Sequence, residues 1–132
     1  MLFRSEHPEV AASYHNLAVD YRKFGKDNEA KERNEKALVI RKKIYGEDHP
    51  DVATSYYNLA FDYGRLGRHN EEKDCNEKAL MIRKKIYGEQ HPDVAASYHR
   101  MAYHYSGVKE QIWAKEHKEK AGMITQIGRA HV

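Results

Sequence analysis

Histidine is the residue type in this chain best suited to metal binding or acid–base chemistry, and it occurs nine times among 132 residues. Three of them, His7, His49 and His91, each precede a proline and recur 42 residues apart. Residues so far apart would not converge on one ion. His99 and His104 are five residues apart, whereas a zinc-binding pair on one helix needs a spacing of four. We therefore predict no metal site and no cofactor.

Catalytic motifs give no support for an enzyme. The sequence has no Gly-rich phosphate loop, no nucleophile elbow and no Cys–His pairing in a recognisable context. Cys75 lies among charged residues and is predicted to be an incidental surface or partly buried thiol. As the one cysteine it can form no internal disulfide, which fits a reducing compartment. No apolar run approaches the ~20 residues of a membrane span, and residues 1–6 lack a signal-peptide core. We expect a soluble cytoplasmic protein.

The charge is balanced, with 23 Lys and Arg against 20 Asp and Glu. This argues against nucleic acid as a partner, which would require a one-sided basic surface. Two basic runs, 41–43 and 83–85, alternate with Glu35, Glu47, Glu77 and Glu89. We interpret Arg41, Arg83 and their lysine neighbours as a solvated helix face, and not as a membrane- or nucleic-acid-binding patch.

The chain is built from an internal repeat of 42 residues. His7-Pro8 returns as His49-Pro50 and as His91-Pro92, and the segment 76–80 repeats 34–38. The first two repeats agree at 28 of 42 positions, and the third drifts after Tyr105. The repeats span about 7–48, 49–90 and 91–125. A period of this length is typical of solenoid architectures.

Each repeat predicts two helices. In the first repeat one helix runs from about Pro8 to Phe24, capped by His7 or a neighbour, with proline at its first position. The second runs from about Asn28 to Tyr45 and ends at Gly46. Apolar residues at helical spacing predict the buried faces. They are Val10, Tyr14, Leu17, Ala18 and Tyr21 on the first helix, and Ala30, Ala37, Leu38, Ile40 and Ile44 on the second. Neither pair can bury its face alone, so stacking of neighbouring pairs is expected.

These residues resemble tetratricopeptide repeats, specifically the 42-residue form found in kinesin light chains. The resembling elements are Asn16-Leu17-Ala18 with Tyr21, Gly25, Ala30 and Ala37-Leu38, most of which recur 42 residues later, and the Ile-Arg-Lys-Lys-Ile-Tyr-Gly-Glu linker. The resemblance covers about residues 1–124. It implies an all-α fold, a right-handed α-solenoid of antiparallel helix pairs containing three tetratricopeptide repeats.

Several positions depart from this pattern. Polar Asn34, Asn76 and Lys118 stand where the second helix usually carries a bulkier packing residue. Glu72 replaces the small residue found as Ala30, and Gly122 stands where leucine is expected. Lys109 replaces a glycine. We therefore expect looser packing in the third repeat, where Trp113 is predicted to pack in the last helix pair.

The last residues differ in character from the repeats. Residues 126–132 resemble a translated sequencing adapter, so we expect a non-native tail there and an array over 1–125. No terminal capping helix follows the third repeat, although solenoids usually need a polar cap. Both features predict that the natural protein continues.

The resemblance implies a binding surface on the first helix of each repeat, which lines the concave side of such arrays. Three- and four-residue steps select the exposed face of these helices. The predicted groove residues are His15, Asn16, Val19, Arg22 and Lys23 in the first repeat, Tyr57, Asn58, Phe61 and Arg65 in the second, and His99, Arg100 and Tyr103 in the third.

The residue types on this face suit a peptide. An asparagine side chain offers a donor and an acceptor together to an extended backbone. Phe61 and Tyr103 offer apolar area with few rotatable bonds, and Arg22, Lys23, Arg65 and Arg100 can pair with acidic side chains. The alternative is that these are ordinary solvated helix residues and that Phe61 packs between repeats.

The predicted function is therefore a protein- or peptide-binding scaffold or adaptor that prefers an acidic and apolar segment. Two alternatives stay open. The array could be an assembly element that self-associates weakly through its exposed end repeats. It could also be a regulatory segment of a larger nucleotide-binding signalling protein, because similar repeats accompany such domains.

Overall fold

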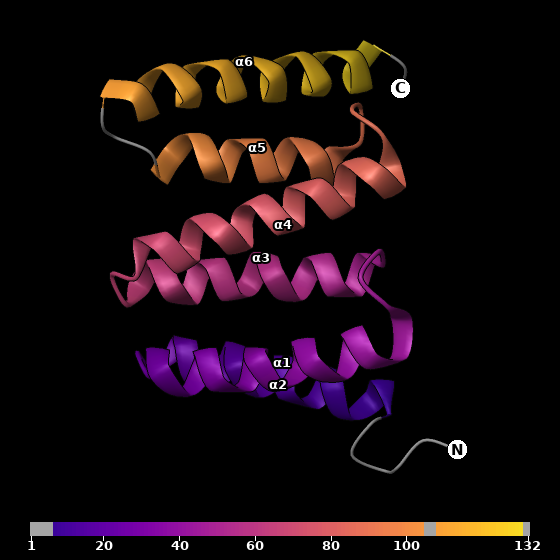
Figure 1. Cartoon of the computed structure of the whole chain (residues 1–132), viewed down its shortest axis with the longest axis vertical. Helices are drawn as coiled ribbons and strands as arrows, with labels where there is room; N and C mark the ends of the chain where they lie inside the picture. Colours follow the sequence, from indigo (N-terminus) through magenta and orange to yellow (C-terminus); the bar gives the residue numbers. More distant parts are fainter. Residues whose placement is uncertain (1–6, 105–107, 131–132) are drawn as a thin grey trace. The chain divides into compact units, whose positions relative to one another are not determined.

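The computed structural model describes the backbone of residues 7–104 and 108–130, and the side chains of 7–102 and 115–126. All regular elements in these ranges are α-helices: α1 (Pro8–Lys23), α2 (Asp27–Tyr45), α3 (Pro50–Arg65), α4 (His69–Tyr87), α5 (Pro92–His104) and α6 (Val108–Ala130) (Figure 1). The predicted helix positions are confirmed to within one residue for α1 and α2. The chain divides into two compact units, Met1–Ala79 and Leu80–Val132, with the boundary inside α4.

The first helix of each of the first two repeats ends in the same glycine turn. Gly25 has φ 73° and Gly67 has φ 74°, a left-handed conformation that glycine adopts without steric cost. After α1, the Gly25 amide donates to the Arg22 carbonyl at 3.0 Å and the Lys26 amide to the Tyr21 carbonyl at 2.9 Å. This pair of bonds is a Schellman motif, which satisfies the last carbonyls of the helix.

The link between repeats is built around a histidine. The Nδ1 atom of His49 accepts the amide proton of Asp51 at 3.1 Å and so caps α3. Its ring stacks on Tyr45 with centroids 3.9 Å apart. His91 repeats both contacts, with Asp93 at 3.1 Å and Tyr87 at 3.9 Å. His7 occupies the equivalent cap position of α1, but its side chain makes no capping bond.

In the first unit, α2 packs between α1 and α3. Ala11 and Ala37 are fully buried where α1 and α2 meet, and Ile40 joins them with partial cover from Val10 and Tyr14. Small residues at this contact let the two helices approach closely.

The prediction that Leu17 of α1 is a core residue is wrong. Leu17 is 43% exposed, although its equivalents Leu59 and Met101 are 2% and 1% exposed. Helix α2 packs against both α1 and α3, but on α3 its Arg41 bonds Ser55, one turn before Leu59, whereas the equivalent Ser13 of α1, one turn before Leu17, is exposed.

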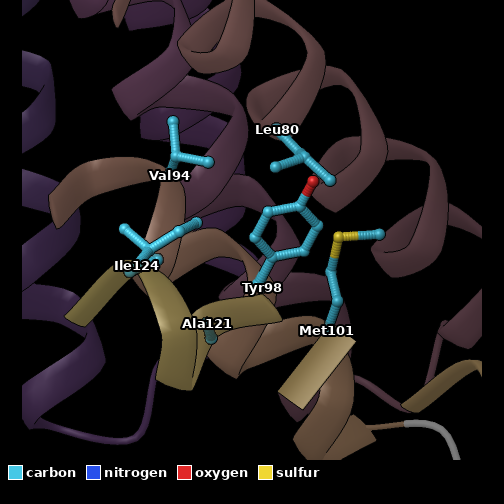
Figure 2. Packing of buried hydrophobic residues seen from close by; sticks show 7 residues of the cluster. Leu80, Val94, Tyr98, Met101, Ala121 and Ile124 are labelled. Carbon is cyan, nitrogen blue, oxygen red and sulfur yellow. The ribbon is translucent and has the colours of Figure 1, made fainter. Parts of the chain in front are cut away.

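In the second unit, α5 and α6 lie side by side and antiparallel (Figure 1). Tyr98 lies at the centre of a cluster whose other members come from α4, α5 and α6 (Figure 2). These members are Leu80, Val94, Ala95, Met101, Ala121 and Ile124. Val94 and Tyr98 are as buried as their second-repeat equivalents Val52 and Tyr56. The looser packing expected of the third repeat is therefore not seen in this cluster.

The basic runs are only partly a solvated face, which corrects the interpretation from sequence. Arg83 is 7% exposed and donates to the Ser97 hydroxyl at 3.0 Å and to the Asp93 carbonyl at 3.3 Å. Arg41 donates to Ser55 at 2.9 Å in the same way. Each arginine therefore ties a second helix to the first helix of the next repeat. Lysines such as Lys42, which pairs with Glu47 at 3.1 Å, stay near the surface.

The remaining expectations concern the end of the chain. Gly122 borders open space, since an added Cβ atom would meet no heavy atom within 4 Å. The helix α6 continues through Gln126 to Ala130, without a break at the predicted tail boundary. The side chain of Trp113 lies outside the described residues. None of the helices, as far as they are described, is long and apolar enough to cross a membrane.

Candidate peptide-binding face

The predicted groove residues lie on the first helices, as expected, and none of those described is buried. Asn16, Lys23, Arg65 and His99 are exposed, and His15, Val19, Arg22, Tyr57, Asn58, Phe61 and Arg100 are half-buried. Tyr103 belongs to α5, but its side chain lies outside the described residues. The structure connects the members on α1 and α3, which both belong to the first unit.

His15 and Asn58 join α1 to α3 in the middle of this face. The Nδ2 atom of Asn58 lies 3.2 Å from Nδ1 of His15. An amide nitrogen can only donate, so this contact requires an unprotonated Nδ1 on the imidazole. Burial lowers the pKa of His15 below its usual value, helped by the positive charges of Arg41 and Arg22 and opposed by Asn34 and Asp62. The neutral imidazole is therefore the form that fits this site.

A buried carboxylate near the C-terminal end of α3 holds together the side chains at that end of the face. Asp62 of α3 is fully buried and accepts two bonds from Arg22 of α1, from Nε at 3.1 Å and from Nη2 at 2.9 Å. Asn34 of α2 donates to the other carboxylate oxygen at 2.5 Å. Burial raises the pKa of Asp62, and the bonds from Asn34 and Arg22 oppose that rise. One carboxylate thus fixes side chains from three helices.

Two guanidinium groups lie close to the aromatic ring of Phe61. Arg22 lies over the ring at 4.6 Å from its centroid, and Arg65 lies at 5.9 Å. Arg65 also pairs with Asp27 of α2 at 2.7 Å. Cation–π contacts of this kind contribute about 0.5–2 kcal/mol each, depending on exposure. Phe61 is therefore held in place while part of its ring stays accessible.

Sequence reasoning missed three polar members of the site, two carboxylates and an amide. Asp62, Asp27 and Asn34 were not among the predicted residues, although they determine where Arg22 and Arg65 point. A signal was present in Asn34, a polar residue at a position where apolar packing was expected. A buried asparagine needs a partner, and that requirement could have led to the neighbouring carboxylate.

Helix α5, the first helix of the third repeat, belongs to the second unit. His99 is exposed and Arg100 is half-buried. Across the side chains that the structure describes, no three His, Cys, Asp or Glu residues could hold a metal ion together. Cys75 is half-buried, and burial raises the pKa of its thiol to about 11.

Comparison with known proteins decides the family. The tetratricopeptide repeat family model matches residues 9–85. This chain belongs to the tetratricopeptide repeat family. No curated protein sequence matches it. Its all-α fold of helix pairs is the fold of a protein–protein interaction scaffold.

Solved structures identify the repeat subtype. The crystal structure of nearly identical TPR-like repeats from a Podosopora anserina kinesin light chain is similar to this chain. The two share 32% sequence identity with a TM-score of 0.78, and the match covers 93% of this chain and 58% of that one. A variant of that protein gives 31% identity and TM-score 0.82, over 97% and 60%. BtubC (BKLC) from P. vanneervenii gives 28% identity and TM-score 0.82, over 94% and 49%. This tetratricopeptide protein therefore has kinesin light chain-like repeats, and it spans about half to three fifths of those chains.

Proposed function

We propose that the first-helix face of α1 and α3 binds a short extended segment of a partner protein, so that the chain acts as a scaffold or adaptor. The observation that carries the proposal is the fixed arrangement of Asn58, His15 and Phe61 on one accessible face. A side chain held in place before binding loses less conformational entropy when a ligand arrives. The role is binding, not catalysis.

The polar and apolar members of the face have separate tasks. Asn16 is exposed and Asn58 half-buried, and their amides suit the alternating donors and acceptors of a peptide backbone. The half-buried ring of Phe61 suits an apolar side chain of the peptide. A segment of a few extended residues with one apolar anchor fits this arrangement.

The proposed preference for acidic peptides depends on which basic side chains of the face are available to an acidic residue. Arg22 and Arg65 already pair with Asp62 and Asp27. An acidic ligand would have to compete with these carboxylates, whereas Lys23 is exposed in the last turn of α1. We therefore place the acidic residue of the peptide beside Lys23. The proposed compartment is the cytoplasm, in keeping with a single cysteine that is free in the structure.

A peptide library tests the proposal directly. Twelve-residue peptides displayed on phage are selected on the whole chain, and the enriched sequences are titrated by fluorescence anisotropy. We expect Asn58→Ala and Phe61→Ala each to weaken binding about tenfold, the effect of about 1.4 kcal/mol. Val39→Ala is the matched control, because Val39 is 65% exposed on α2.

The same titration tests the acidic element. Lys23→Gln is expected to weaken acidic peptides by a few fold, in line with an exposed ion pair, and to leave charge-reversed peptides unchanged. Equal affinity for acidic and charge-reversed peptides would refute the acidic preference alone. A failure to enrich any sequence, or binding that Asn58→Ala and Phe61→Ala leave intact, would refute the site.

A further inference from the structure

A second surface of α1 is distinct from the peptide-binding face. It is formed by Val10, Ser13, Tyr14 and Leu17, which we call the edge face. Of these residues Leu17 and Ser13 are exposed and the other two are half-buried. Their equivalents one repeat later, Val52, Ser55, Tyr56 and Leu59, are all buried, as are Val94, Ser97, Tyr98 and Met101 two repeats later.

The structure shows what covers this surface in the second and third repeats. It is the second helix of the preceding repeat, through the same arginine and tyrosine each time. In the first unit Arg41 bonds Ser55 at 2.9 Å and Tyr45 stacks on His49. In the second unit Arg83 bonds Ser97 at 3.0 Å, Tyr87 stacks on His91, and Leu80 joins the apolar cluster. The covering helix therefore carries the pattern Leu-x-x-Arg-x-x-x-Tyr.

The edge face has a hollow at the position of that arginine and tyrosine. A depression of about 330 Å³ is lined by His7, Glu9, Val10 and Ser13. The equivalent residues of the third repeat include Asp93 and Ser97, whose carbonyl and hydroxyl oxygens accept from Arg83. On α1 the Ser13 hydroxyl instead donates to the Glu9 carbonyl at 3.0 Å. The acceptors for an arginine are thus present on the edge face.

The last helix of this chain does not carry the covering pattern. At the positions of Leu80, Arg83 and Tyr87, α6 has Gly122, Thr125 and Arg129. It lacks both the leucine that fills the apolar contact and the guanidinium that reaches the serine. Head-to-tail stacking of two copies through α6 would therefore leave the hollow without its arginine.

We propose that the edge face binds an amphipathic helix with the pattern Leu-x-x-Arg-x-x-x-Tyr, the second helix of another 42-residue repeat. Its leucine covers Leu17 and Tyr14. Its arginine donates to the Ser13 hydroxyl and the Glu9 carbonyl, and its tyrosine stacks on His7. The surface and the ligand differ from those of the proposed peptide-binding face, so the two proposals stand independently.

A labelled peptide with the sequence of residues 27–46 tests this inference. It is titrated against the whole chain by fluorescence anisotropy, and its helicity is followed by circular dichroism. We expect saturable binding with a gain of helix. A peptide with Arg41→Ala is expected to bind about tenfold more weakly, because a charged hydrogen bond is lost. Arg41→Lys keeps the charge but not the fork of donors and is expected to bind more weakly too.

Variants of the chain locate the contact. Leu17→Glu is expected to weaken binding at least about tenfold, since it places a charge in an apolar contact. Met81→Glu, on a 69% exposed position of α4, and Asn58→Ala are expected to leave the affinity unchanged. Thermal unfolding verifies that each variant folds.

Three results would overturn the proposal. They are the absence of saturable binding, equal affinity for the Arg41→Ala peptide, and full binding by the Leu17→Glu chain. Sedimentation of the chain alone tests the second copy as occupant. Concentration-dependent association that Leu17→Glu abolishes would assign the edge face to a copy of this chain, contrary to the proposal.

Discussion

Helices α1 and α3 carry the same serine, leucine and aspartate one repeat apart, yet these residues have opposite environments. Ser55, Leu59 and Asp62 of α3 are all buried. Their α1 equivalents, Ser13, Leu17 and Asp20, are all exposed. The two helices do not differ in residue type at these positions but in what surrounds them. Helix α2 packs against both helices, but on α3 it reaches the serine side through the Arg41–Ser55 bond, whereas the equivalent Ser13 of α1 stays exposed.

This difference shows that burial in the repeat is a property of the neighbouring helices. Asp62 is buried because Arg22 and Asn34 bring donors from α1 and α2. The same carboxylate on α1, Asp20, faces solvent. Nearest-neighbour contacts of this kind are the main source of stability in solenoids. Variants at equivalent positions of the two helices therefore test the comparison directly.

The largest expected effect is at the aspartate pair. Asp62→Ala leaves Arg22 and Asn34 without their buried acceptor, so we expect the free energy of unfolding to fall by about 3 kcal/mol. Asp20→Ala is the matched control and is expected to change it by less than about 0.5 kcal/mol. Urea denaturation measures both. Similar losses for the two variants would contradict the comparison.

The leucine pair tests the apolar side. Leu59→Ala creates a cavity under α2 and is expected to cost about 2 to 3 kcal/mol. Leu17→Ala removes a side chain that is 43% exposed and is expected to cost less than about 1 kcal/mol. The same denaturation experiment compares them. A larger loss at Leu17 than at Leu59 would show that α1 is covered in solution.

A coupled pair of substitutions sharpens the comparison. Where the first repeat has Arg22 and Ala30, the second has Gly64 and Glu72. Glu72 is 3% exposed, and a Cβ atom added to Gly64 would clash with its carboxylate. We expect Gly64→Ala alone to cost about 1 kcal/mol or more, because the buried carboxylate must move. In the Glu72→Ala background the same change is expected to stabilise α3, since alanine favours helix over glycine.

A double-mutant cycle of these variants gives the coupling free energy. Additive effects would contradict the account, because they would show that Glu72 moves aside without cost.

The smallest effect is expected from a histidine pair. Burial lowers the pKa of His15, so the folded chain favours the neutral imidazole while the unfolded chain binds a proton below pH ~6.5. The contribution of His15 is therefore present above that pH and is lost as the pH falls. His15→Gln should make stability less sensitive to pH between 7.5 and 5.5. His99→Gln, at the equivalent exposed position of α5, is the matched control. Equal slopes for both variants would contradict the assignment.

The sequence alone predicted the helices, their order and the face that carries the candidate site. It could do so because proline, glycine and apolar spacing act locally, as the turns at Gly25 and Gly67 illustrate. It did not predict the exposure of Leu17 or the burial of Arg83. Both depend on whether a helix of a neighbouring repeat covers the residue. The residue pattern within one repeat does not encode that neighbour.

The sequence predicted that the candidate residues lie on the accessible face of the first helices, but not the contacts between them. The accessible members Asn58 and Phe61 follow from helical spacing. The pairing of Arg22 with Asp62 does not, because it joins residues 40 positions apart through a geometry that only the packed helices define. This pairing narrows the proposed acidic contact on α1 and α3 to Lys23, one of the basic residues named from sequence.

In the proposed function, peptides bind where α1 and α3 present Asn58, His15 and Phe61. Its most direct test is a titration of the isotope-labelled chain with a selected peptide, followed by NMR. We predict the largest shift changes at the side-chain amide of Asn58, the ring of Phe61 and neighbouring amides of α1 and α3. Shift changes confined to the exposed side of α2 around Val39, with Asn58 unmoved, would contradict the claim.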